Sequence, residues 1–271
     1  MASFRLSTNP LTDLRIEMSE SIKSMGDQGG DQRVGSVLQS KVDRLRVLHG
    51  YKSGVELLRA MMEEEFPGKI AVVSAFGTES AVLLDLIGSI SKTIPIIFLD
   101  TGKHFPETLE YRERLISHLG LTNVRSQEPA DSEINEDDPK GELWRINADY
   151  CCHLRKVLPL ERVLEPFDAW ITGRKRFQTG SRKRLESIEL VGKHIKINPL
   201  AAWGVTQLKE YFGLRNLPKH PLSLRGYPSV GCAPCTQPIE AGEDQRSGRW
   251  GDSEKTECGI HKAAWARYWT I

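Results

Sequence analysis

The chain has 271 residues and a formal net charge of +1 at pH 7, with 37 Lys and Arg against 36 Asp and Glu. This balance speaks against a nucleic-acid-binding protein, whose binding face carries an excess of positive charge. No apolar run approaches the roughly 20 residues that a transmembrane helix needs, so we expect no membrane association. Five cysteines are an odd number, which does not suit a secreted disulfide scaffold.

The N-terminal residues 1–40 are polar and weakly periodic, and we expect a flexible leader there. The first 20 residues lack an apolar core and carry three acidic side chains, unlike a secretory signal or a transit peptide. We therefore expect a cytoplasmic protein. A helix is predicted near 41–65, where a single nucleotide-binding domain begins that extends to about residue 240.

Short apolar and β-branched runs predict five strands, at 69–77, 93–102, 123–127, 167–173 and 194–201. Helical spacing predicts helices between them, at 79–90, 106–120 and 152–164. This alternation predicts an α/β fold, a mostly parallel sheet with helices on both faces. Residues 241–271 have too few apolar side chains to fold alone, so we expect a mobile C-terminal tail.

Ligands of such sheets bind at the carboxyl ends of the strands. The loop after the first strand, "SAFGTES", has a glycine where the strand turns into a helix, and its amides suit an anion. It matches neither the Walker nor the dinucleotide glycine pattern, and an ordinary turn is the alternative. The second strand ends in "DTG", where Asp100 suits ribose hydroxyls. The candidate contacts are Ser74, Phe76, Gly77, Thr78, Glu79, Ser80, Asp100, Thr101 and Gly102.

Four cysteines are candidate ligands of one metal centre. Adjacent Cys151 and Cys152 are poor ligands for one zinc ion, whose sites favour two to four intervening residues. A polynuclear iron–sulfur cluster offers separate irons to successive thiolates, and Cys232 and Cys235 would complete a four-cysteine set. The alternatives are core packing for the adjacent pair, and a redox dithiol or half a zinc site for the C-x-x-C.

The fifth cysteine, Cys258, lies in the polar tail and is a candidate nucleophile. A nucleophilic cysteine must be a thiolate, which nearby positive charge favours. Glu257 opposes this, whereas Arg249, His261 and Lys262 favour it. The alternative is an inert, solvated tail cysteine.

Basic residues cluster after the fourth predicted strand, in "TGRKRFQTGSRKR". Such a run ordinarily forms a solvated face, and we expect this for Lys183 and Arg184. Arginines near strand ends instead suit a phosphate or sulfate, whose oxygens match the guanidinium fork. The members of this run are Arg174, Lys175, Arg176, Arg182, Lys183 and Arg184, and Arg246 and Arg249 follow in the tail.

Taken together, the chain resembles the assimilatory adenylyl-sulfate reductases, the iron–sulfur branch of the adenylyl-sulfate and phosphoadenylyl-sulfate reductase family. The stretches that carry the resemblance span about 69–262 and include "SAFGTESAVLLDL", "IFLDTGKHFPET", "CCHLRKVLPL", "WITGRKRFQ", "GYPSVGCAPCTQPI", "RSGRW" and "ECGIH". Relatives often carry Ser or Thr where this chain has Ala75.

The resemblance implies an adenine nucleotide alpha hydrolase-like fold of the PP-loop type and a [4Fe-4S] cluster on Cys151, Cys152, Cys232 and Cys235. It implies catalysis by Cys258, with Lys156 between cluster and sulfate. The further residues expected at the substrate are the 74–80 loop, Asp100, Thr101, Gly102, Gly173, Arg174, Arg176, Arg246, Arg249 and His261.

The implied reaction is the reduction of adenylyl sulfate to sulfite and AMP through an S-sulfocysteine, with thioredoxin as reductant, in sulfate assimilation and cysteine biosynthesis. Members of the family are often homo-oligomers. Three alternatives stay open: reduction of 3'-phosphoadenylyl sulfate, ATP-dependent adenylation or thiolation, and a non-catalytic iron–sulfur or zinc redox sensor.

Overall fold

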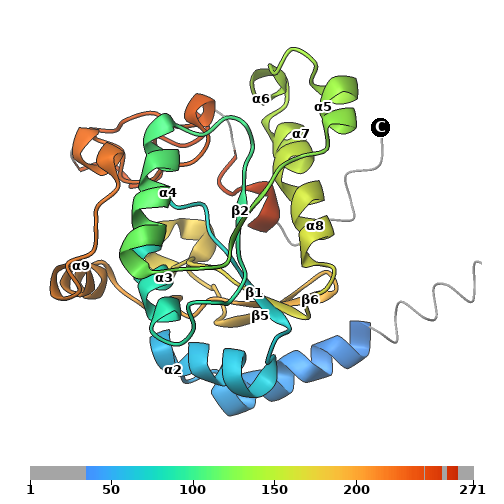
Figure 1. Ribbon diagram of the computed structural model, residues 1–271, viewed down its shortest axis with the longest axis vertical. Coiled ribbons are helices and arrows are strands. Elements are labelled where there is room, and N and C mark those ends of the chain that lie inside the picture. Colours follow the sequence, from blue (N-terminus) through green and yellow to red (C-terminus); the bar gives the residue numbers. More distant parts are fainter. Residues whose placement is uncertain (1–34, 241, 252–254, 262–271) are drawn as a thin grey trace, which may run out of the picture.

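The computed structural model describes residues 35–240, 242–251 and 255–261, and the predicted leader up to residue 34 lies outside them. Its centre is a six-stranded sheet in the order β3-β2-β1-β4-β6-β5, in which only β5 runs antiparallel to its neighbour (Figure 1). The strands are β1 (Ile70–Val73), β2 (Ile96–Leu99), β3 (Val124–Gln127), β4 (Ala169–Ile171), β5 (Ile188–Val191) and β6 (His194–Ile197).

Helices cover both faces of this sheet. They are a helix at 35–49, α2 (Gly54–Arg59), α3 (Ser80–Gly88), α4 (Pro106–Leu119), α5 (Asp131–Asp137), α6 (Leu143–Ile146), α7 (Ala148–Cys152), α8 (Leu158–Leu164) and α9 (Val205–Leu214). Two π-helical stretches, Ala60–Glu65 and His153–Val157, continue α2 and α7. Within the described ranges, no helix combines the length and apolar character needed to cross a bilayer.

Side chains that alternate along each strand form two separate cores, because successive residues point to opposite faces. Ile70 and Val72 pack with α2, α3, α4 and the helix at 35–49. Ala71 and Val73 pack on the other face with the apolar side chains of α8. Figure 1 shows the two layers, α3 and α4 on one side of the strands and α7 and α8 on the other. The predicted fold class is therefore confirmed.

The single helix predicted near 41–65 is wrong, because a turn at residues 50–53 divides it. The amide of Gly50 still donates to Arg46, but Gly54 has a φ of +53°, which ends one helical direction and starts another. Strand β5 was not predicted from the sequence. It is one of the two edge strands, and its two central residues are only half-buried, so its pattern is less apolar than that of the inner strands.

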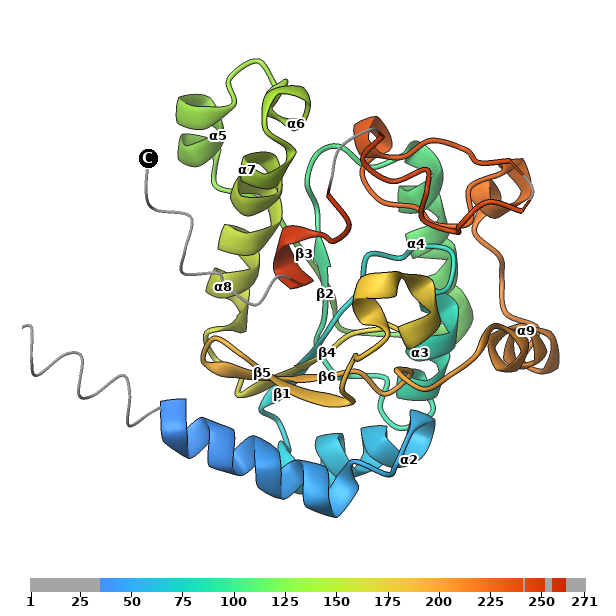
Figure 2. The same cartoon turned by 180° about the vertical axis from the view of Figure 1, so that it is seen from behind.

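The C-terminal part of the chain does not form a separate unit in the described residues. Residues 242–250 fold back along 235–240, with the Trp250 amide donating to the Cys235 carbonyl at 3.0 Å and the Gln237 amide to Gly248 at 2.8 Å. The 3-10 turn Gly259–His261 lies against α7 and α8 (Figure 2). Its Ile260 is 9% exposed and belongs to the core beneath α8.

Candidate active site

Two cavities meet at the carboxyl ends of the strands. The larger lies where the chain order of the sheet reverses, between β1 and β4, which is the usual ligand position in sheets of this type. The smaller lies next to it, beneath α7. Two side chains line both cavities, Lys156 and Arg249, and both are cationic. The charges of Lys156 and Arg249 therefore act on groups in both cavities.

All four predicted metal ligands line the smaller cavity. Cys151 and Cys152 are the last two residues of α7, and the Asn147 side chain caps the start of this helix by accepting a hydrogen bond from the Tyr150 amide. The helix then widens into its π-helical stretch, a feature that often marks functional sites. The wider turn follows immediately after the cysteine pair, so the local backbone differs from a regular helix at the point where both thiols must face one cavity.

Cys232 and Cys235 reach the same cavity from the other side, although they follow Cys152 by 80 and 83 positions in the chain. Cys232 forms a β-bridge with His104, and the Ala233 amide donates to the Lys103 carbonyl at 2.7 Å. The Thr101 hydroxyl lies 3.3 Å from the Cys232 sulfur. The segment that follows β2 thus holds the C-x-x-C turn in place.

The lining of the smaller cavity is strongly cationic. Besides the four cysteines it carries Lys103, Arg155, Lys156 and Arg249, and no carboxylate among the described residues. Arg155 is held from behind by Asp138, with Nη2 at 2.6 Å from Oδ2, and it donates through Nη1 to the Thr101 carbonyl at 3.0 Å. Both side chains of this pair are nearly inaccessible, at 9% and 3% exposure.

This donor set fits an anionic iron–sulfur cluster better than four free thiols. Burial raises the pKa of Cys151 to about 11, so burial alone disfavours the thiolate, which coordinated iron would stabilise. In the described part of the chain, no three His, Cys, Asp or Glu side chains converge closely enough for one metal ion. Cationic side chains around the site would offset the net negative charge of a cluster with four thiolates.

The larger cavity contains the fifth cysteine, Cys258, together with Lys156, Arg246, Arg249 and His261. A hydrogen bond from the Cys152 thiol, and then the charge of Lys156, lower the pKa of Cys258 well below its ordinary value although burial opposes this. Gly259 brings the tail close, because a Cβ built there would lie 3.1 Å from Val157 and 3.4 Å from the Cys152 Cβ. The predicted nucleophile is thus inside the site, at the boundary of the two cavities.

Arg246 and Arg249 are the cations of this cavity with unused donors. Each donates weakly to the Ser229 hydroxyl, at 3.5 and 3.3 Å, and each has a buried Nε without a hydrogen-bond partner among the described residues. Both guanidinium groups lie over the Trp250 ring, at 5.2 and 4.7 Å from its centroid. Burial lowers the pKa of Arg246 to about 10. Buried guanidinium donors without partners are suited to an anionic ligand.

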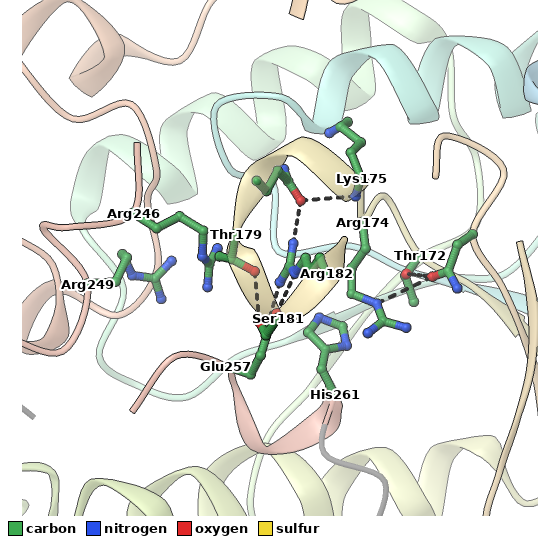
Figure 3. Close-up of polar contacts among 12 residues, drawn as sticks. Thr172, Arg174, Lys175, Thr179, Ser181, Arg182, Arg246, Arg249, Glu257 and His261 are labelled. Atoms are coloured by element: carbon green, nitrogen blue, oxygen red, sulfur yellow. Dashed lines mark hydrogen bonds and ion pairs between the residues drawn. The ribbon is translucent and has the colours of Figure 1, made fainter. Parts of the chain in front are cut away.

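Three other basic side chains of the larger cavity are already paired. Lys175 donates to Glu79 at 2.8 Å. Arg174 is bonded to Glu189, and Arg182 to Glu257. Figure 3 shows Arg246 and Arg249 on one side, Arg174 and His261 on the other, and the Arg182–Glu257 pair between them.

His261 is held from the side of the sheet. Lys196, on β6, lies 3.1 Å from its Nδ1, and the same ammonium lies 4.5 Å from the centroid of the Trp170 ring, which stacks on His261. Burial, followed by the charge of Lys196, lowers the pKa of His261 well below its ordinary value. The imidazole is therefore neutral at pH 7.

The 74–80 loop is tied to the segment that follows α9. The Thr78 hydroxyl donates to the Pro228 carbonyl at 2.6 Å, and the buried Ser74 hydroxyl accepts from the Phe76 amide at 3.2 Å. Phe76 has a φ of 47°, an unusual conformation for a side chain of this size. The loop residues on the lining are Ser74, Ala75, Gly77, Thr78, Glu79 and Ser80, and Gly173 and Arg174 follow from β4.

Five residues expected at the substrate do not line the larger cavity. The Phe76 ring is fully buried in the core against Phe98. Asp100 accepts from the Gly102 amide at 3.0 Å, and Gly102 itself is exposed. Thr101 lines the smaller cavity instead. Arg176 is exposed and donates to the Leu185 carbonyl at 2.8 Å.

Several lining residues were not singled out in advance. His104, Thr172, Gln178 and Ser229 line the larger cavity, and so do Lys175 and Arg182, which the sequence placed only in a general basic run. The signal for the two basic residues was their position just after a strand. Their pairing partners lie far away in sequence, so nothing local separated them from the exposed Lys183 and Arg184.

Comparison with known proteins shows which family the chain is similar to. Residues 69–238 match the phosphoadenosine phosphosulfate reductase domain. An adenosine 5'-phosphosulfate reductase of Mesorhizobium japonicum is 48% identical over 235 residues, which cover 87% of this chain and 92% of that protein. A phosphoadenosine 5'-phosphosulfate reductase of Gloeobacter violaceus is 40% identical over 201 residues, covering 72% and 83%.

Among solved structures, the chain is similar to the phosphoadenylyl-sulfate reductase of Candida auris, determined as a phosphate complex. The TM-score is 0.61 and the sequence identity 30%, over 73% of this chain and 97% of the other. The region that matches the reductase domain includes both cavities apart from the tail that carries Cys258.

Proposed function

The chain belongs to the phosphoadenosine phosphosulfate reductase family, and from that premise we propose that it reduces adenylyl sulfate to sulfite and AMP with thioredoxin as the electron donor. One observation carries the proposal. A single cysteine outside the four-thiol set, Cys258, shares a cavity with two arginines whose buried Nε donors have no partner among the described residues.

In the first step, the Cys258 thiolate attacks the sulfur of the bound phosphosulfate. A new bond forms between the cysteine sulfur and the sulfur of the sulfate group. The bond from the sulfate sulfur to the bridging oxygen breaks, and AMP leaves with that electron pair. Arg246 and Arg249 would donate to the sulfonate and phosphate oxygens, and Lys156 would offset charge on the attacking sulfur. Preorganised donors of this kind stabilise the transition state most strongly in a buried site.

In the second step, a thioredoxin thiolate attacks the Cys258 sulfur and releases sulfite. A second thioredoxin thiol then attacks the mixed disulfide, which regenerates the Cys258 thiolate and leaves thioredoxin oxidised. The two electrons that reduce the sulfur therefore come from the dithiol. Since thioredoxin must reach Cys258, we propose that the tail leaves the cavity between the two steps. The mobility predicted for the tail from the sequence would permit this movement.

Cys151, Cys152, Cys232 and Cys235 would hold a [4Fe-4S] cluster, the cofactor that the donor set of the smaller cavity suits. When bound, it would supply a fixed charge beside Lys156 and a covalent tie between α7 and the C-x-x-C turn. The chain's own residues carry the chemistry, because the electrons come from thiols. A reducing compartment, the cytoplasm, suits free thiols of this kind.

The nucleotide would lie across the 74–80 loop, most of whose residues line the larger cavity. The second candidate substrate is 3'-phosphoadenylyl sulfate, which the name of the Gloeobacter violaceus relative favours. Neither reaction step uses the four cysteines of the smaller cavity. The presence of that cavity therefore does not decide whether the substrate is adenylyl sulfate or its 3'-phosphorylated form.

The test is sulfite release by anaerobically purified protein with reduced thioredoxin and one nucleotide at a time. We expect turnover with adenylyl sulfate at a kcat/KM above that for the 3'-phosphorylated nucleotide. Cys258→Ser is expected to retain iron and acid-labile sulfide but to release no sulfite. A Cys258→Ser protein with wild-type turnover would overturn the proposal, and a wild-type protein that releases no sulfite with either nucleotide would favour the redox-sensor alternative.

A further inference from the structure

A buried ion pair connects the residue next to Cys258 to the body of the protein. Arg182, in the 3-10 turn Gly180–Arg182, donates to both carboxylate oxygens of Glu257, with Nε to Oε1 at 2.5 Å and Nη2 to Oε2 at 2.6 Å. The two side chains are only 6% and 12% exposed. Figure 3 shows the pair between the arginines of the tail and His261. A two-point bond of this type fixes direction as well as distance.

The same arginine is bonded to the substrate loop. Its Nη1 donates to the Gln178 side-chain oxygen, and the Gln178 side-chain amide donates to Glu79 at 2.6 Å. Glu79 lies at the end of the 74–80 loop and also accepts from Lys175 at 2.8 Å. An unbroken chain of polar contacts therefore runs from this loop to the residue before Cys258.

Other contacts hold the tail without touching this loop. Lys255 donates to the Ala148 carbonyl at 3.2 Å and pairs with Asp149, both at the start of α7. Ile260 packs beneath α8. These contacts fix the position of the tail along α7 and α8, whereas Arg182 connects the tail to residues that line the larger cavity beside the 74–80 loop.

The ion pair also removes an electrostatic problem that the sequence poses. A free carboxylate next to a nucleophilic thiolate opposes its ionisation and repels an anionic substrate. Against burial, which would raise it, the bonds and charge of Arg182 lower the pKa of Glu257 below its ordinary value. The carboxylate is thus bonded to Arg182 through both oxygens, and its charge is balanced.

We propose that Arg182 is a positioning residue, which holds Cys258 in the larger cavity by pairing with Glu257 and which links this closed position to the 74–80 loop through Gln178. The inference rests on the proposed function. The proposal requires that the Arg182–Glu257 pair assists the attack of Cys258 on the substrate, which takes place while Cys258 is in the larger cavity. The later attack by thioredoxin, for which the tail must be outside, does not need the pair.

The experiment measures the two steps separately for the wild type, Arg182→Gln, Glu257→Gln and the double variant. Each protein is mixed with adenylyl sulfate without reductant, and the S-sulfocysteine on Cys258 is followed by quenched-flow mass spectrometry. The isolated adduct is then mixed with reduced thioredoxin, and sulfite release is timed. Arg184→Gln is the matched control, since Arg184 lies in the same basic run and is exposed.

We expect both single variants to form the adduct on the order of 100-fold more slowly, as for a buried pair that loses one partner. The double variant should be no slower than either, because both substitutions remove one interaction. Sulfite release from the adduct should stay within about two-fold of wild type. Arg184→Gln should match wild type in both steps.

Two results separate the possible failures. If the wild type forms no adduct on Cys258, the proposed function itself fails. If the wild type forms it and Glu257→Gln forms it equally fast, the role of Arg182 is wrong. Glu257→Gln alters only the tail, so it decides the question even if the Arg182 variant does not fold. Equal slowing of both steps would also contradict the proposal, because it would indicate general damage.

Discussion

The substitution Gly231→Ala, next to Cys232, should displace the Arg249 side chain and so remove its function without unfolding the protein. A Cβ built on Gly231 lies 2.1 Å from Nη2 and 2.6 Å from Cζ of Arg249. The guanidinium would have to move by roughly 1 Å to reach normal contact, whereas the backbone at Gly231 has no left-handed φ that forbids alanine. The clash therefore falls on the flexible end of one side chain.

Because a misplacement of about 1 Å at a reacting centre can cost about 100-fold, we expect kcat/KM of Gly231→Ala to fall by that factor. The free energy of unfolding should change by less than about 1 kcal/mol. The assays are sulfite release and urea denaturation, with iron and acid-labile sulfide checked against wild type. Gly213→Ala is the control, because Gly213 lies at the exposed end of α9 with no atom within 4 Å of its built Cβ.

The double variant with Arg249→Ala tests the physical cause. If the alanine at 231 acts only through the guanidinium, adding it to Arg249→Ala should lower kcat/KM no further. A Gly231→Ala enzyme with near wild-type kcat/KM, or one whose loss adds fully to that of Arg249→Ala, would refute the reasoning.

Three further predictions concern stability and the cofactor. Asp138→Asn should lower the free energy of unfolding by about 3 kcal/mol at pH 7, since it leaves Arg155 buried and unpaired. Against the effect of burial, Arg155 holds the pKa of Asp138 below its ordinary value, so the stabilisation is present above about pH 4 and is lost as pH falls through that lower pKa. Urea denaturation of both proteins at several pH values should show the difference shrinking in acid. Cys235→Ser should purify with much less iron and acid-labile sulfide than wild type, by colorimetric assay. Gly248→Ala should lower the free energy of unfolding by about 1–3 kcal/mol in thermal denaturation, because its Cβ would lie 2.2 Å from the rigid Gln237 carbonyl oxygen.

The inner strands were predictable from the sequence because each is buried on both faces. Strands β1 and β2 each have four consecutive buried residues, and short apolar runs of this kind are typical of the inner strands of a parallel sheet. The edge strand β5 lacks this signal, since its centre is half-buried. The break between the helix at 35–49 and α2 depends on Gly54 packing against Trp203, a residue far along the chain.

Residue type and spacing suggested a four-cysteine set and a separate candidate nucleophile, and the structure places the four cysteines on one cavity and Cys258 on the other. The sequence could not predict which charged side chains form ion pairs when they lie far apart along the chain. Arg182 and Glu257 lie 75 residues apart, and only the folded chain shows that the carboxylate beside Cys258 is neutralised. The positions of Arg176 and Asp100 were equally hidden, because a residue near a strand end can turn toward a neighbouring backbone group instead of the cavity.

The central claim is a separation of roles among the five thiols, and one measurement tests it most directly. Anaerobic protein is incubated with adenylyl sulfate in the absence of any dithiol, digested, and every cysteine-containing peptide is examined by mass spectrometry for a sulfonate adduct. We predict about one sulfonate per chain, on Cys258 alone, together with an equal amount of AMP. A sulfonate on Cys151, Cys152, Cys232 or Cys235, or AMP released without any adduct, would contradict the account.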